Sequence, residues 1–80
     1  MDIILSKKAA KSLEAMDKPT QARIAAGISA IPKGNIRPLK GAPGTYRLRV
    51  GDWRILFSYP SQNKILIEKI APRGDIYKGV

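Results

Sequence analysis

The 80-residue sequence contains neither cysteine nor histidine. Without cysteine the chain can form no disulfide and has no thiolate nucleophile. This composition suits a reducing compartment, so we expect a cytoplasmic protein. Without histidine it lacks the commonest general base and the commonest zinc ligand. The carboxylates are few and scattered, so we expect neither a metal site nor a cofactor. They are Asp2, Glu14, Asp17, Asp52, Glu68 and Asp75.

Long apolar runs are also missing. No stretch approaches the roughly 20 apolar residues of a membrane-spanning helix, and residues 1–5 show no basic region followed by an apolar stretch and a cleavage site. We therefore expect no membrane association and no signal peptide. The apolar share of 44% is ordinary for a globular protein. The short length predicts one small domain over residues 1–80.

Negative charge is scarce relative to positive charge. The net charge is +9 and the isoelectric point is near 10.3. In so short a chain, this excess indicates a nucleic acid or an acidic protein as partner. From residue 33 onward, ten basic residues stand against three acidic ones. A loop with Arg37 and Lys40 and a tail with Lys78 are therefore candidates for binding RNA phosphates.

Residues 46–59, YRLRVGDWRILFSY, contain two runs of strand-forming residues around Gly51-Asp52, which predicts a two-residue hairpin turn. Pairing outward from this turn sets Val50 opposite Trp53 and Arg49 opposite Arg54. Directly opposed residues point to the same side of a sheet. One side reads as core: Tyr46, Leu48, Val50, Trp53, Ile55 and Phe57. The other side carries three arginines, Arg47, Arg49 and Arg54, with Leu56 and Ser58 further along.

Three guanidinium groups on one side of a hairpin allow two interpretations. Arginine on the outer face of an amphipathic strand is ordinary, and the group can simply be solvated. Like charges directly opposite each other cost stability, however, and a bound polyanion would relieve their repulsion. The hairpin alone leaves both interpretations open.

Residues 2–31 predict a strand and two helices. A short β-like run, residues 2–5, is followed by Ser6 as a helix N-cap, and apolar spacing predicts a helix over residues 7–16. Pro19 can begin a second helix that ends at Pro32, and the tight link predicts an antiparallel helical hairpin. The expected apolar stripes are Ala9, Ala10, Leu13 and Met16 in the first helix, and Ala22, Ile24, Ala25, Ile28 and Ile31 in the second.

Residues 32–45 contain three Pro and three Gly and predict a long loop. After the hairpin we expect a turn at residues 60–63 and a last strand over residues 64–71, whose mixed apolar pattern indicates a central position. The order is β-α-α-β-β-β. We expect an α+β fold in which the N-terminal helical hairpin covers one face of a small, mostly antiparallel sheet. The arginine-bearing face is then left open.

If this chain acts on RNA, its composition restricts the chemistry. Two-metal cleavage needs a carboxylate cluster that the sequence lacks. Metal-free cleavage remains, in which the 2′-hydroxyl of the substrate attacks the adjacent phosphate. Arginines suit this reaction because each presents a fixed fork of donors to phosphate oxygens.

The motifs YRLRVGDWRILF, at residues 46–57, and IAPRGDIY, at residues 70–77, resemble the RelE/ParE superfamily of toxins from type II toxin–antitoxin pairs. The strand and helical hairpin ahead of them also match that fold, so the resemblance covers nearly the whole chain. RelE-type members cut mRNA in the ribosomal A site without a metal, whereas ParE-type members poison DNA gyrase. The resemblance implies a cognate antitoxin as partner and, for a RelE-type member, the ribosome and mRNA.

The RelE-type site implies catalytic roles for Arg47, Arg49, Arg54, Arg73 and Tyr77. Arg47 and Arg54 would clamp the phosphate, and Tyr77 would stack on a base or orient the 2′-hydroxyl. Arg73 would act as general acid or as an electrostatic stabiliser. RelE-type enzymes often have lysine in the positions of Arg47 and Arg49, and arginine is a poor proton acceptor. The general base is therefore open between Tyr77, Lys40 and a ribosomal RNA group.

These residues favour a ribosome-dependent endoribonuclease, because a gyrase poison has no need for Arg54, Arg73 and Tyr77 together. The alternatives are a ParE-like inhibitor of gyrase and an inactive module that binds RNA or the antitoxin.

Overall fold

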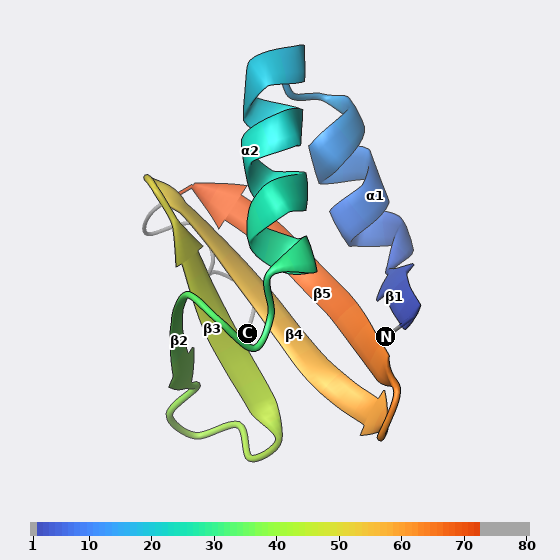
Figure 1. The fold of residues 1–80 in the computed structure, drawn as a ribbon, viewed down its shortest axis with the longest axis vertical. Helices are drawn as coiled ribbons and strands as arrows, with labels where there is room; N and C mark the ends of the chain where they lie inside the picture. Colours follow the sequence, from blue (N-terminus) through green and yellow to red (C-terminus); the bar gives the residue numbers. More distant parts are fainter. Residues whose placement is uncertain (1, 73–80) are drawn as a thin grey trace.

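The computed structural model describes residues 2–72 (Figure 1). The elements follow the order β1 (Asp2–Leu5), α1 (Lys7–Glu14), α2 (Lys18–Ser29), β2 (Asn35–Pro38), β3 (Thr45–Val50), β4 (Trp53–Ser61) and β5 (Lys64–Pro72). The expected α+β fold is confirmed, with one strand more than predicted. Arg73, Tyr77 and Lys78 lie outside the described residues.

All five strands belong to one sheet in the order β1-β5-β4-β3-β2. Among the described strands only β1 and β5 are parallel, so the sheet is mostly antiparallel, as predicted. The central strand is β4. β5 is also an interior strand, and its Ile65, Ile67, Ile70 and Ala71 are buried.

The hairpin of β3 and β4 has the predicted register, with Val50 opposite Trp53 and Arg49 opposite Arg54. Gly51 has a φ of 58°, which suits a two-residue turn in which that position is left-handed. Leu48 and Phe57 on the predicted core side are buried. Trp53, on the same side, is half-buried and packs against the main core cluster.

The two helices are antiparallel neighbours over one face of the sheet (Figure 1). Ser6 caps α1, since its Oγ accepts a hydrogen bond from the Ala9 amide at 3.0 Å. The side chain of Gln21 closes the link, donating from Nε2 to the carbonyl oxygens of Leu13 and Met16. No helix within residues 2–72 is long and apolar enough to cross a membrane.

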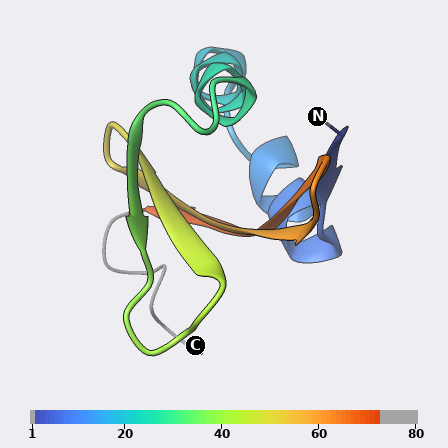
Figure 2. The same ribbon diagram turned by 60° about the horizontal axis from the view of Figure 1, so that its bottom comes forward.

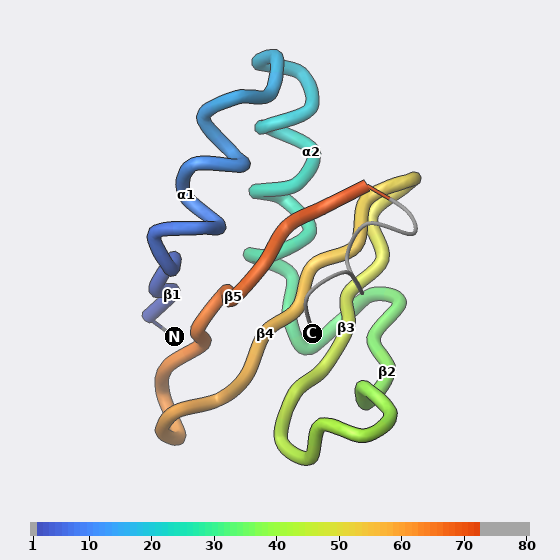
Figure 3. Tube along the Cα trace, turned by 180° about the vertical axis from the view of Figure 1, so that it is seen from behind, coloured from blue at the N-terminus to red at the C-terminus, as the bar shows by residue number. Residues whose placement is uncertain are grey.

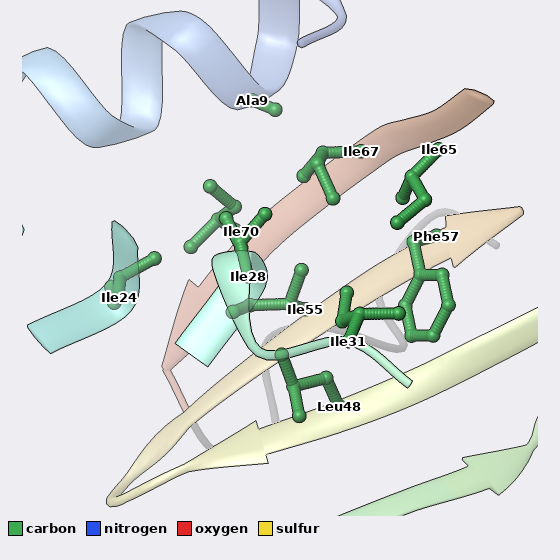
Figure 4. Close-up of a cluster of buried hydrophobic side chains, with 10 residues drawn as sticks. All are labelled: Ala9, Ile24, Ile28, Ile31, Leu48, Ile55, Phe57, Ile65, Ile67 and Ile70. Atoms are coloured by element: carbon green, nitrogen blue, oxygen red, sulfur yellow. The ribbon is translucent and has the colours of Figure 1, made fainter. Parts of the chain in front are cut away.

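The main core lies between α2 and the sheet (Figure 4). Its buried members are Ala9, Ile24, Ile28, Ile31, Leu48, Ile55, Phe57, Ile65, Ile67 and Ile70. Ala22 and Ala25 were predicted on the apolar stripe of α2, but both are exposed. The helix is rotated so that Ile24, Gly27 and Ile28 face the sheet, and Gly27 allows α2 to approach Val50 closely.

Two predictions for the connections were wrong. Within residues 32–45, β2 pairs with β3, which satisfies the free edge of β3 and lets Ile36 pack on the core opposite Leu48. The expected turn at residues 60–63 is shorter because β4 runs to Ser61, which pairs with Lys64. Pairing across the sheet thus overrides the local preference of Pro and Gly for loops.

Candidate nucleic-acid interface

We call the face of the sheet turned away from α2 the outer face; Figure 3 views the molecule from behind. Directly paired residues form rows across the strands on this face. One row is Asn35, Arg49, Arg54 and Ala71, and the next is Arg37, Arg47, Leu56 and Lys69. The two rows bring Arg37, Arg47, Arg49 and Arg54 together as an arginine patch.

Arg49 and Arg54 form the half of the patch beside the hairpin turn. Arg54 donates from Nη1 to the carbonyl oxygens of Gly51 at 3.3 Å and Trp53 at 3.2 Å. Arg49 donates from Nε to the same Gly51 carbonyl at 3.5 Å. The shared acceptor holds two like charges near each other at the turn. Each guanidinium has five donors, so most of them remain available to a ligand.

Arg37 and Arg47 form the other half, directly opposite each other on β2 and β3. Arg47 is half-buried, and its Nε is buried without a hydrogen-bond partner in the described part of the chain. Buried donors are nearly always partnered, so this atom suits an acceptor supplied from outside. Sequence reasoning placed Arg37 in a loop, and only the pairing of β2 brings it beside Arg47.

The patch concentrates positive charge on the β2–β3–β4 side of the outer face. Opposed like charges destabilise a sheet by a fraction of a kcal/mol to about 1 kcal/mol per pair. Within residues 2–72 no carboxylate forms an ion pair with any of the four arginines. An anion with several oxygens, such as a phosphodiester, would offset this repulsion and take up the unused donors.

The other predicted site residues are not all brought to the patch. Lys40 is exposed in the loop 39–44, which begins where the Leu39 amide donates to the Thr45 carbonyl at 2.8 Å. Thr45 is four residues from Arg49, or roughly 13 Å along the strand. The structure therefore places Lys40 away from the turn-side arginines. The roles given to Arg73, Tyr77 and Lys78 stay predictions.

The outer face is not fully open, which corrects one expectation. Leu56 is only 5% exposed and Ala71 only 7%, and Leu39 packs against this pair. The loop between β2 and β3 lies on the opposite side of the sheet from α2 (Figure 2). The sequence signal for this cover was Leu56, an apolar residue between Arg54 and Ser58 on the outer side of β4. A pocket of about 320 Å³ is left beside Leu39 and Leu56.

Comparison with known proteins gives a family and a fold. Residues 3–77 match the sequence model of a family described as the ParE toxin of the type II toxin–antitoxin system parDE. The toxin–antitoxin complex RelB–RelE of Methanococcus jannaschii is similar, with a TM-score of 0.74, 25% identity, and coverage of 92% of this chain and 94% of that chain. The RelE–RelB complex of Pyrococcus horikoshii gives 0.74 at 26% identity, covering 91% and 94%.

The isolated RelE toxin of E. coli has the same fold at much lower identity. Its TM-score is 0.72 at 10% identity, and the match covers 90% of this chain and 83% of that chain. A comparison with curated protein sequences gives no match.

Proposed function

Because the chain belongs to the ParE toxin family of type II toxin–antitoxin systems and has the fold of RelE toxins, we propose that it inhibits translation by cutting mRNA on the ribosome. The family match alone makes the chain a toxin of a type II pair. The arginine patch supports RNA cleavage as its activity. Because the proposed targets are mRNA and the ribosome, the protein would act in the cytoplasm.

The observation that carries the proposal is the pairing of four arginines in two adjacent rows of one sheet face. Consecutive phosphates of an extended RNA strand present a line of charge that two such rows can follow. The unpartnered Nε of Arg47 supports the proposal further, because a phosphate oxygen is an acceptor that this buried donor lacks. A solvated arginine face would not need a buried donor.

The proposed reaction forms a bond between the 2′-oxygen and the adjacent phosphorus and breaks the bond from phosphorus to the 5′-oxygen of the next nucleotide. A base takes the 2′-hydroxyl proton, and an acid supplies a proton to the leaving 5′-oxygen. The products are a 2′,3′-cyclic phosphate and a free 5′-hydroxyl. Arg47 and Arg54 would neutralise the extra charge on the pentacoordinate phosphorus and hold the nucleotide in line.

The reaction also needs groups that donate and accept protons. Arg73 would be the acid or an electrostatic stabiliser, and Tyr77 would stack on a base or orient the 2′-hydroxyl. Arginine holds its proton too tightly to serve as the base. The base would be Tyr77, Lys40 or a group of the ribosome. Dependence on the ribosome follows if the ribosome positions the RNA or supplies that base.

A cognate antitoxin is the expected protein partner, since the similar structures from M. jannaschii and P. horikoshii are complexes of a toxin with its antitoxin. An antitoxin segment with acidic residues would complement the net charge of +9 and cover the arginine patch.

Inhibition of DNA gyrase is the second candidate, and the name of the matched family favours it. The two candidates differ in what they require of the arginines. RNA cleavage needs them in contact with the reacting phosphate, whereas a gyrase inhibitor needs only a surface that fits gyrase.

Cleavage and supercoiling assays run in parallel distinguish the two candidate functions. The purified protein is incubated with ribosomes programmed with mRNA, with the same mRNA alone, and with gyrase in a supercoiling reaction. We expect cleavage on ribosomes, little cleavage of free mRNA, and unchanged supercoiling. Loss of supercoiling without any cleavage would replace the nuclease with the gyrase inhibitor. A short RNA cut at high protein concentration in EDTA tests metal independence separately from the ribosome's own need for magnesium.

A further inference from the structure

The edge strand β1 exposes large apolar side chains on both of its sides. Among residues 2–72, three of the four exposed large apolar residues lie on this one strand: Ile3 is 41% exposed, Ile4 42% and Leu5 38%. Ile3 and Leu5 pair with Ile65 and Ile67, which are buried in the main core. The apolar layer under the helices therefore continues to the edge of the sheet and is left partly exposed there.

The two edges of the sheet are built differently. β1 and β2 are the end strands of the sheet, so each has one side without a neighbouring strand within residues 2–72 (Figure 1). Proteins usually protect such edges with charged side chains or proline. β2 carries Arg37 and ends at Pro38, whereas β1, with the sequence DIIL, contains no basic residue and no proline. Only β2 has the protection expected of an edge that must stay unpaired.

The backbone of β1 turns hydrogen-bonding groups toward the open side. The Asp2 amide donates to the Asn63 carbonyl at 2.7 Å, in the direction of β5. The Ser6 amide donates in the same direction, to a carbonyl of β5 at 2.9 Å. Successive residues of a strand alternate in direction, so the amides and carbonyls of Ile3 and Leu5 point away from β5. These groups can pair with a further strand.

Exposed positive charge lies at both ends of this edge. Lys7 and Lys8 follow β1 at the start of α1, and Lys64 pairs with Asp2 at the beginning of the strand. All three lysines are exposed. A partner strand that alternates apolar residues with carboxylates would meet apolar side chains along β1 and lysines at its two ends.

We propose that β1 is the docking edge for an extended acidic segment of the antitoxin, which adds to the sheet as a further strand. Main-chain hydrogen bonds to Ile3 and Leu5 supply the affinity, and alternate apolar side chains of the segment pack on both sides of β1. The inference rests on the antitoxin expected under the proposed function and locates the place where it attaches.

The docking edge is separate from the arginine patch. Neighbouring strands are about 4.8 Å apart, so Arg47 on β3 lies three strands, or roughly 14 Å, from β1. Arg37 on β2 lies one strand further away. A segment paired with β1 holds the antitoxin without occupying the patch, and a different part of the antitoxin reaches the arginines. Antitoxin binding and action on RNA should therefore be separable by substitution.

A second copy of the chain is the main rival for this edge, because two β1 strands could pair with each other. That pairing would bring together two chains of net charge +9, with lysines at both ends of the paired strands. An acidic segment makes the same main-chain hydrogen bonds and removes the repulsion. The charge around β1 thus favours a different protein over a second copy.

Binding at the edge is measured first with a short synthetic peptide that alternates valine and glutamate. We expect an NMR titration to shift the amide signals of Ile3 and Leu5 and to slow the exchange of these amides with solvent. The same peptide with lysine in place of glutamate is the control and should not bind. Shifts confined to the arginine patch, or the absence of any saturable shift, overturn the docking edge. Protection of the same amides without peptide would assign the edge to a second copy and also overturn the proposal.

Two variants then test the antitoxin itself by calorimetry. Ile3→Pro removes an outward-pointing amide and leaves the amides that face β5 in place, and Ile4→Asp sets a negative charge in the middle of the strand. Each should weaken antitoxin binding on the order of tenfold or more. Ala25→Asp, on the exposed face of α2, is the matched control and should bind as the unaltered protein does.

Thermal unfolding of each variant shows whether it is folded, and Ile4→Asp alone suffices if Ile3→Pro is not. Unchanged antitoxin affinity in a folded Ile4→Asp variant overturns the docking edge. Loss of affinity in Ile4→Asp with mRNA cleavage retained supports both proposals. The same loss of affinity in a protein that never cuts mRNA supports the docking edge and counts against the nuclease alone.

Discussion

The two faces of the sheet differ in almost every physical property. The face under α2 packs with the helices into a cluster of ten buried apolar residues, while the outer face, within residues 2–72, buries only Leu56 and Ala71 and carries four arginines. Most of the burial that stabilises the fold therefore comes from one face. The other face is free to hold an arrangement of charges that lowers stability, which is typical of binding sites.

The same strands serve both faces. In β3, Leu48 is buried under the helices while Arg47 and Arg49 on either side of it point to the outer face. In β4, Ile55 and Phe57 likewise face the core, while Leu56 between them in the sequence faces the outer side. Alternation along a strand thus couples a stiff core directly to the site, and the core fixes the spacing of the arginines. Substitutions on the two faces should consequently separate stability from activity.

Phe57→Ala should give the largest effect. Phe57 is fully buried, and its ring stacks on Tyr46 with a centroid distance of 5.7 Å. We expect a loss of about 3–5 kcal/mol in the free energy of unfolding, which is enough to unfold a domain of this size. Chemical denaturation followed by tryptophan fluorescence measures it. A variant with an unaltered midpoint would show that the core does not lie where Figure 4 places it.

Arg47→Ala should strongly lower the rate of mRNA cleavage and change the free energy of unfolding only slightly. Losing one preorganised charged donor typically raises a barrier by about 3–4 kcal/mol, or 10²–10³ in rate. The cleavage rate on programmed ribosomes and the unfolding midpoint are measured on the same preparation. Arg23→Ala, on an exposed turn of α2, is the control. Equal loss of rate in both variants would mean that only net charge matters.

Gly27→Ala tests the close approach of α2 to β3. A Cβ built on Gly27 would lie 2.7 Å from Cγ2 of Val50, whose branched side chain has little freedom to move. Overpacking typically costs about 1–3 kcal/mol, and better helix propensity returns at most about 1 kcal/mol. We therefore expect a net destabilisation near 1 kcal/mol by thermal unfolding, without loss of binding at the arginine patch. A more stable variant would show that α2 can move away freely.

Arg49→Gln should give the smallest effect and the opposite sign. Arg49 is exposed and lies directly opposite Arg54, so removing its charge relieves repulsion. The free energy of unfolding should rise by a few tenths of a kcal/mol, and the gain should shrink at high salt. Paired denaturation curves at low and high salt are the measurement. Lower stability at low salt would indicate that the hydrogen bond to Gly51 outweighs the repulsion.

The sequence predicted the features that depend on local pattern. The hairpin register followed from Gly51-Asp52 and the alternation around it, and this register already placed Arg49 opposite Arg54. β2 was missed because Pro38 and the surrounding glycines favour a loop, while its stability comes from pairing with β3. The burial of Leu56 was missed for the same reason, since Leu39 reaches it only once the loop has folded.

The buried face of α2 could not be predicted from the sequence for a different reason. Ala22 and Ala25 fit an apolar stripe as well as Ile24 and Ile28 do, because alanine is compatible with both burial and exposure. The close approach at Gly27 determines the rotation, and its partner Val50 is distant in sequence. The site was predictable in part: Arg47, Arg49 and Arg54 lie together as expected, and Arg37 joins them through β2, while Lys40 is exposed in the loop 39–44.

The central claim is that the arginines of the outer face act on RNA. The most direct test maps new mRNA 5′ ends in cells that express the unaltered protein, Arg54→Ala or Arg23→Ala at matched levels. We predict new 5′ ends within coding regions and arrested growth for the unaltered protein and Arg23→Ala, and neither for Arg54→Ala. Arrested growth with no new 5′ ends, or full toxicity of Arg54→Ala, would contradict the account.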